Sequence, residues 1–184
     1  MISKEQGKLL LKLARDAIAA HFTQKEPNIA EYKAKFNQPS GVFVTLKKNG
    51  ELRGCIGYPL PIYPLWQAVM KAAVAAAFQD PRFLPLKEDE LNEIKVEVSV
   101  LSQPELIKAD TPKDFFKQIK IGEHGLIIEY RFNSGLLLPQ VATEYNWDAA
   151  TFLRHLCLKA GLPEYAWKEK GVKIYRFTAQ VFSE

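Results

Sequence analysis

Stretches in which apolar residues recur at helical spacing predict the helices of this chain. The first follows Ser3-Lys4-Glu5-Gln6, a capping box whose serine and glutamine satisfy free backbone groups, and its apolar stripe predicts a helix of about 18 residues. The alanine-rich segment 65–78 predicts a helix with close neighbours on several sides. Thr111 before Pro112 is typical of a helix start, and Gly161 of a helix end. The other predicted helices cover residues 30–36, 87–92, 111–118 and 147–160.

Alternating and β-branched segments predict strands between these helices. In residues 94–101 valines alternate with polar residues, and residues 42–48 are rich in β-branched side chains. Two more strands, 126–130 and 135–138, are expected on either side of a turn at residues 133–135, and one closing strand is expected over residues 171–182. Two hairpins separated by helices, without regular βαβ units, predict an α+β fold with mainly antiparallel sheets and packed helices.

The first hairpin has a turn whose type the sequence predicts. Asn49-Gly50 provides the two residues with positive φ that a type I′ turn needs. A two-residue loop gives the pairs Lys48 with Glu51, Leu46 with Arg53, Val44 with Cys55, and Val42 with Gly57. In this register Arg53, Cys55 and Gly57 share one face of the hairpin, so a site is expected there.

Composition narrows the class of protein. A chain of 184 residues buries roughly 70% of its unfolded surface, enough for a stable core. A net charge of +4 is too balanced to indicate nucleic-acid binding by itself. With two distant cysteines and no CxxC pair, neither a disulfide framework nor a zinc site is expected. Three scattered histidines and the absence of a P-loop or GxGxxG motif predict no metal or cofactor. Without a signal peptide or membrane-spanning segment, we expect a cytoplasmic protein.

Cys55 is the first candidate for chemistry. It lies between Gly54 and Gly57, where missing side chains leave room for another molecule to approach. Arg53 is about 7 Å away along the strand, and a guanidinium at that range favours a thiolate. The alternative is that Cys55 packs as a small hydrophobe, as free cysteines often do. The residues support both interpretations equally.

His124 is the second catalytic candidate, because a thiol nucleophile needs a base and this histidine lies in a glycine-flanked turn. A surface histidine without a role is the alternative. The candidate ligand-binding residues Asp80, Arg82, Glu97 and Ser99 also have simpler interpretations: an ion pair for Asp80 and Arg82, and a solvated strand face for Glu97 and Ser99. Gln140 and Glu144 are candidates for a polar rim with Trp147, which as an alternative is only a hydrophobic staple. His21 and His155 are expected to be structural or solvated, and Cys157 to belong to the core.

Several blocks in a fixed order resemble one family, the AMMECR domain, known in microbes as AmmeMemoRadiSam system protein A. The blocks are Gly41–Val44, Leu52-Arg53-Gly54-Cys55-Ile56-Gly57, Asp80–Phe83, Val96–Leu101, His124–Leu126, Leu138–Ala142 and Lys173–Phe177. The resemblance implies one domain over residues 1–184, made of two intimately associated lobes that flank a cleft, with Leu52–Gly57 as its hallmark. It also implies radical-SAM and Memo-type proteins as possible partners, and no settled activity.

Three hypotheses for function follow from these observations. The first is an enzyme, or enzyme component, that uses Cys55 in the cleft on a small or nucleotide-like substrate, while Arg53 binds an anionic group. The second is a non-catalytic accessory subunit that presents the cleft to a radical-SAM or Memo-type partner. The third is a nucleic-acid-associated protein, which requires lysines and arginines to cluster on one face. Whether the chain is an enzyme stays open between the first two.

Overall fold

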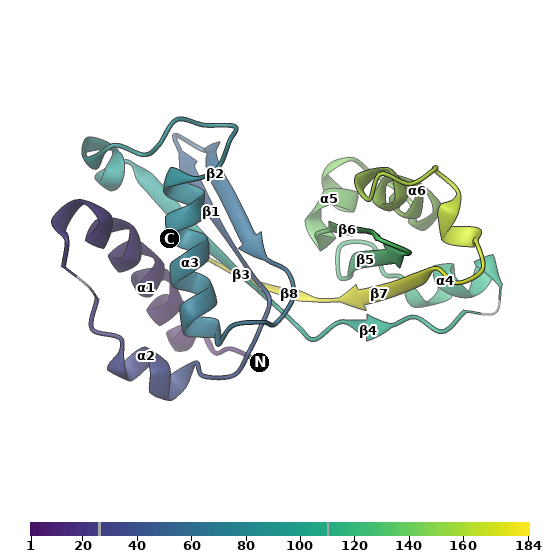
Figure 1. Cartoon of the computed structure of the whole chain (residues 1–184), viewed down its shortest axis with the longest axis horizontal. Helices are drawn as coiled ribbons and strands as arrows, with labels where there is room; N and C mark the ends of the chain where they lie inside the picture. The colour runs from purple at the N-terminus through teal and green to yellow at the C-terminus, as the bar shows by residue number, and fades with distance from the viewer. Residues whose placement is uncertain (26, 110) are drawn as a thin grey trace. The chain divides into compact units, whose positions relative to one another are not determined.

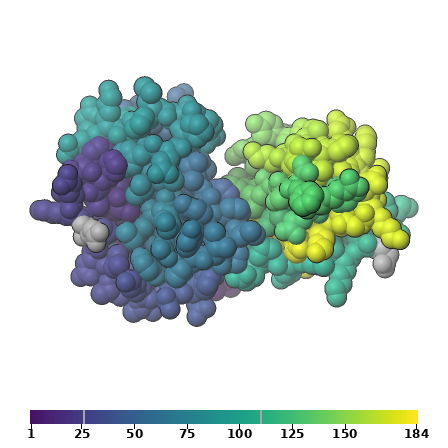
Figure 2. All heavy atoms as spheres, in the orientation of Figure 1, coloured from purple at the N-terminus to yellow at the C-terminus, as the bar shows by residue number. Residues whose placement is uncertain are grey.

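The computed structural model describes residues 1–25, 27–109 and 111–184, which form two compact units (Figure 1). The first unit contains residues 1–101 and 180–184, and the second contains residues 102–179. Within each unit side chains fill the gaps between the ribbons (Figure 2). None of the helices in the described ranges is long and apolar enough to cross a membrane.

The first unit is a four-stranded sheet with helices on one face. The strand order is β2-β1-β3-β8, and β1 pairs antiparallel with both of its neighbours. The strands are β1 (Val42–Lys48), β2 (Glu51–Tyr58), β3 (Ile94–Leu101) and β8 (Ala179–Ser183). The helices are α1 (Lys4–Thr23), α2 (Ala30–Lys35), α3 (Leu65–Phe78) and the 3-10 turn η1 (Glu88–Asn92). Helices α1 and α3 pack side by side against the sheet (Figure 1).

The alternation of side chains in β1 and β3 decides which face of this sheet the helices cover. Val44 and Val98 lie opposite each other, are fully buried, and join the core that α1 and α3 complete. Thr45 and Glu97, the adjacent residues on these strands, point to the other face because successive side chains of a strand alternate between the two faces. The first unit therefore has a helix-covered face and an opposite face that carries polar side chains.

The second unit has its own sheet and its own core. All its strand pairs are antiparallel, in the order β4-β7-β5-β6. The strands are β4 (Glu105–Leu106), β5 (Gly125–Tyr130), β6 (Asn133–Leu137) and β7 (Lys173–Phe177). The helices are α4 (Pro112–Gln118), α5 (Pro139–Glu144), α6 (Ala149–Lys159) and the 3-10 turn η2 (Ala166–Lys168). Phe152, Leu156 and Cys157 of α6 are fully buried against this sheet, which confirms Cys157 as a core residue.

The α+β fold with antiparallel sheets is confirmed, and two strand predictions are wrong. The closing strand is two strands: β7 belongs to the second sheet and β8 to the first, with Thr178 between them. The second hairpin turns at Arg131, which has a positive φ, so Asn133 already lies in β6. The sequence analysis also missed three short elements, β4, α5 and η2.

Candidate functional site

The first hairpin contains a β-bulge at Arg53 that changes the predicted register. Asn49 and Gly50 have positive φ, as expected, and Lys48 pairs with Glu51. The pairing then shifts, because two residues of β2 lie where β1 provides one. The observed pairs are Lys47 with Leu52, Leu46 with Gly54, Thr45 with Cys55, Phe43 with Gly57, and Val42 with Tyr58. The predicted partners of Cys55 and Gly57 are therefore wrong by one residue, and Arg53, predicted opposite Leu46, lies in the bulge without a pairing partner in β1.

The bulge places Cys55 on the face of the sheet opposite α1 and α3. Cys55 lies across from Thr45, and Thr45 lies across from Glu97 on β3, so these three residues form one row over three strands. The Thr45 hydroxyl donates a hydrogen bond to Cys55 Sγ at 3.2 Å. We call Cys55, Thr45 and Glu97 the thiol row. Cys55 is only partly buried, so it is not a core residue like Cys157.

The neighbouring rows bring further predicted residues to the same face. Ser99 lies across from Phe43, which lies across from Gly57, and Glu97 forms an ion pair with Lys47 at 3.1 Å. Glu97 and Ser99 therefore share a face with Cys55, as opposite pairs in an antiparallel sheet point the same way. Ser99 is only 2% exposed, so the alternative of a solvated strand face is wrong for this residue. Lys47, from the next row, neutralises Glu97.

The loop after α3 holds the outer edge of β2 at Cys55. The Cys55 backbone N–H donates to Asp80 Oδ2 at 2.9 Å, and Arg82 Nη2 donates to the Cys55 carbonyl at 3.3 Å. Asp80 and Arg82 also form the expected ion pair, at 2.7 Å. The hydrogen bonds from Arg82 and from the Cys55 and Arg82 N–H groups, against the effect of burial, lower the pKa of Asp80 well below its usual range. Because β2 is an edge strand, no neighbouring strand bonds to the outer side of its backbone. Asp80 and Arg82 bond to the Cys55 N–H and carbonyl groups on that side.

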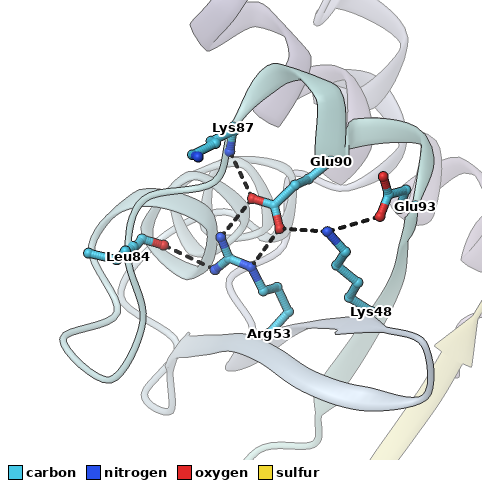
Figure 3. A network of polar contacts seen from close by, with 6 residues as sticks. All are labelled: Lys48, Arg53, Leu84, Lys87, Glu90 and Glu93. Atoms are coloured by element: carbon cyan, nitrogen blue, oxygen red, sulfur yellow. Dashed lines mark hydrogen bonds and ion pairs between the residues drawn. The ribbon is translucent and has the colours of Figure 1, made fainter.

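Arg53 is engaged inside the first unit (Figure 3). Its Nε and Nη2 donate to the two oxygens of Glu90 at 3.1 and 2.9 Å, and its Nη1 donates to the Leu84 carbonyl at 3.0 Å. Lys48 contacts the same carboxylate at 3.1 Å. The Arg53 hydrogen bonds lower the pKa of Glu90 to about 2, with smaller contributions from Lys87 and Lys48. The guanidinium therefore joins the bulge to η1.

Both glycines beside Cys55 lie against other atoms of the chain. A Cβ on Gly54 would lie 2.1 Å from the Ala76 carbonyl oxygen of α3. A Cβ on Gly57 would lie 2.3 Å from the Phe43 ring. The room that the sequence indicated beside the thiol is thus filled, at Gly54 by a helix and at Gly57 by an aromatic ring.

His124 belongs to the second unit and is buried, with 7% of its surface exposed, so the alternative of a surface histidine is wrong. Its Nδ1 accepts a hydrogen bond from the Lys120 backbone N–H at 3.2 Å. Burial, followed by the nearby Arg176 charge, lowers the pKa of His124. Cys55 lies in the other unit, and the pairing of these two residues stays a prediction.

Comparison with known proteins assigns the fold to a family. The sequence profile of the AMMECR1 family matches residues 11–182, which is nearly the whole chain. The chain belongs to the AMMECR1 family. Protein MJ0810 of Methanocaldococcus jannaschii is 50% identical over all of this chain and 92% of its own length. A protein of Aquifex aeolicus is 49% identical over 95% of this chain and 91% of its own. These names state no activity.

A solved structure supports the architecture. The crystal structure of uncharacterized protein PH0010 from Pyrococcus horikoshii matches with a TM-score of 0.91 and 46% identity, over all of this chain and 93% of its own. The AMMECR1 match fixes the family and the fold of this protein, and its biochemical activity is open.

The segment Leu52–Gly57 spans the bulge, the thiol and the α3 contact of β2. The sequence patterns did not indicate Thr45, which donates a hydrogen bond to Cys55, or Glu90, which accepts hydrogen bonds from Arg53. The predicted register placed Val44 opposite Cys55, so Thr45 could be identified as its partner only if the bulge were known. No local signal joins Glu90 to Arg53, since 37 residues separate them.

The remaining candidates lie in the second unit of the AMMECR1 fold. Gln140 and Glu144 are in α5, where Glu144 is exposed, and their ligand-binding role stays a prediction. Trp147 stacks on His155 with ring centroids 3.9 Å apart and on the exposed Tyr145 at 5.1 Å. His155 is thus packed against an aromatic ring, as His21 is against Phe78 at 3.9 Å.

Proposed function

We propose that this AMMECR1 protein binds a small molecule at the thiol row, Cys55, Thr45 and Glu97, and that Cys55 Sγ is the group that reacts with it. The observation that carries the proposal is the Thr45 hydroxyl, which donates to Sγ at 3.2 Å on the face that α1 and α3 leave uncovered. A hydroxyl donor aimed at sulfur stabilises the thiolate, which is the nucleophilic form. The other thiol, Cys157, lies in the core, where burial raises its pKa.

The proposal assigns different roles to the surrounding residues. Asp80 and Arg82 hold the Cys55 peptide, so the sulfur is carried by a backbone bonded on both sides. Glu97 with its partner Lys47 offers both signs of charge to a polar substrate, including a nucleotide-like one. The attacked carbon would bond to Sγ and release its leaving group.

Alkylation of the native protein tests the reactivity of the thiol. We expect iodoacetamide to modify Cys55 at least about tenfold faster than Cys157, since the thiolate of an accessible cysteine reacts and a buried thiol does not. Cys157 is the internal control, and labelling in urea shows that both thiols can react. Equal protection of the two thiols in the folded chain would reject the proposal.

A non-catalytic accessory function is the second candidate, and a specific observation favours it. Arg53 is bound to Glu90, and Gly54 and Gly57 pack against the chain itself, so three hallmark residues have internal roles. In this case the protein presents a surface to a radical-SAM or Memo-type partner. Size-exclusion chromatography of the protein mixed with each purified partner tests it, and separate elution at micromolar concentrations would argue against it.

Nucleic-acid association has less support, because Lys47, Lys48 and Arg53 of the first hairpin are all paired with glutamates. RNA binding that weakens steeply with salt would revive this hypothesis, since released counterions make such binding salt-dependent. Affinity that ignores salt would contradict it. Cytoplasmic localisation also remains a proposal, tested by fractionating cells.

A further inference from the structure

The second unit contains a polar pocket of about 350 Å³ that the thiol row does not use. This volume suits a small ligand. Its lining consists of Ser102, Glu105, Lys120, His124, Arg176, Phe177 and Thr178. Glu105 belongs to β4, Arg176 and Phe177 belong to β7, and Lys120 and His124 lie just before β5, segments that the second sheet brings together. Ser102 and Thr178 lie next to these strands, before β4 and after β7. Two side chains of the lining are cationic and one is anionic.

Arg176 is held in place and keeps donors to spare. Its Nε and Nη2 donate to Glu105 Oε2 at 3.2 and 3.1 Å, and its Nη1 donates to the Gln118 carbonyl at 3.2 Å. These bonds use three of the five guanidinium N–H groups, so two remain. A guanidinium oriented in this way is suited to bind the oxygens of a phosphate or carboxylate.

His124 contributes an imidazole ring to the same pocket. Its Nδ1 accepts a hydrogen bond from the Lys120 N–H. Burial and Arg176 lower the pKa of His124, although Glu123 and the Gln118 backbone act in the opposite direction. The lowered pKa favours the uncharged ring beside the Arg176 guanidinium.

Glu105 and Glu123 hold the cations of the pocket only loosely. Glu105 meets Arg176 through a single carboxylate oxygen, and its side chain is 69% exposed. Lys120 meets Glu123 at 3.4 Å, with both side chains more than half exposed. Exposed pairs of this kind contribute little to stability, so a ligand oxyanion can replace either carboxylate.

We propose that this pocket binds the oxyanion of a small molecule, a phosphate or a carboxylate group, on Arg176 and Lys120, and that Glu105 competes with it. Among its side chains, cationic and neutral donors outnumber the single lining carboxylate. The proposal is independent of the thiol row, because none of its residues belongs to the first unit.

Titration of the full chain with inorganic phosphate, and separately with citrate at constant ionic strength, tests the pocket. We expect saturable shifts in the NMR signals of the His124 ring and the Arg176 Nε. Saturation by phosphate alone identifies a phosphate site, and saturation by citrate alone identifies a carboxylate site. No saturable shift with either anion would overturn the proposal.

Three variants separate an oxyanion site from a structural cluster. Arg176→Gln should weaken binding by at least about tenfold, because charge-assisted hydrogen bonds are lost. Arg131→Gln, a matched change of an exposed residue outside the pocket, should leave it unaltered. Glu105→Gln should tighten binding about threefold or more, since the competitor is removed.

The Glu105 variant keeps the test decisive if Arg176→Gln does not fold. Weaker binding in Glu105→Gln would mean that Glu105 is a ligand contact, which contradicts the proposed competition. Equal weakening in Arg176→Gln and Arg131→Gln would show that the anions bind elsewhere by general charge.

Discussion

The side chain of Asp80 accepts a hydrogen bond from the backbone N–H of Cys55 at 2.9 Å, across 25 residues of chain. It thereby takes the place of a neighbouring strand at the edge of the first sheet. Only 2% of the Asp80 side chain is exposed, and the same carboxylate binds Arg82. The backbone that carries the thiol is thus bonded by β1 on one side and by a buried carboxylate on the other.

Replacing Asp80 should destabilise the first unit. We expect Asp80→Ala to lower the free energy of unfolding by about 2 kcal/mol, because a buried carboxylate with charge-assisted hydrogen bonds is removed. Urea unfolding measures the change. Asp89→Ala, an exposed aspartate in η1, is the control and should lie within about 0.5 kcal/mol of the unmodified chain. Equal stability of the two variants would contradict the role given to Asp80.

The ion pair of Arg53 and Glu90 should make stability depend on acid pH. The pKa of Glu90 is about 2 in the folded chain, below its ordinary value, so its contribution is complete above about pH 5. It is lost as the pH falls towards 2, because the unfolded chain binds the proton first. We expect the stability difference between the unmodified chain and Glu90→Gln to shrink from pH 6 to pH 2.5, measured by urea unfolding. A constant difference would argue against the pair.

Gly54 should tolerate a methyl group worse than Gly50. A Cβ at Gly54 would lie 2.1 Å from the Ala76 carbonyl oxygen, so β2 and α3 must separate. We expect Gly54→Ala to cost about 3 kcal/mol or more, as overpacking against backbone does. Gly50→Ala meets no atom within 4 Å and should cost only about 1 to 2 kcal/mol, from its positive φ. Thermal unfolding measures both variants. A larger loss of stability in Gly50→Ala than in Gly54→Ala would contradict the close contact between β2 and α3.

Thr45 should influence the reactivity of Cys55 and leave Cys157 unchanged. Thr45→Val keeps the shape of the side chain and removes the hydroxyl that donates to Sγ. We expect alkylation of Cys55 by iodoacetamide to slow about threefold to tenfold, which corresponds to one hydrogen bond. Unchanged kinetics at Cys55, in a variant that melts normally, would remove Thr45 from the proposed site.

Local patterns predicted most helices and the first turn of this protein. The capping box at Ser3, the proline after Thr111 and the Asn49-Gly50 turn act within a few residues, and the structure contains each of them. The family resemblance, carried by several blocks in a fixed order, is confirmed by the AMMECR1 match over residues 11–182. The helix caps and the turn depend on backbone groups that bond to residues nearby in the sequence, so a short segment is enough to predict them.

The arrangement around Cys55 depended on contacts that are distant in sequence. Glu90 holds the bulge at Arg53, Asp80 holds the edge of β2, and α3 fills the space beside Gly54. A bulge of one residue moves every later strand side chain relative to its partners, and a local pattern does not contain it.

By itself, the sequence determined the family through its ordered blocks. It also determined the α+β class and most elements of the fold, because helix caps, turn residues and apolar periodicity act locally. Only the tertiary structure decided that Cys55 lies in a row with Thr45 and Glu97, and that Arg53 binds Glu90. It also placed His124 beside Arg176 in a pocket of the second unit. Strand register and ion pairs between distant segments depend on the packing of the whole sheet, which no short stretch of sequence encodes.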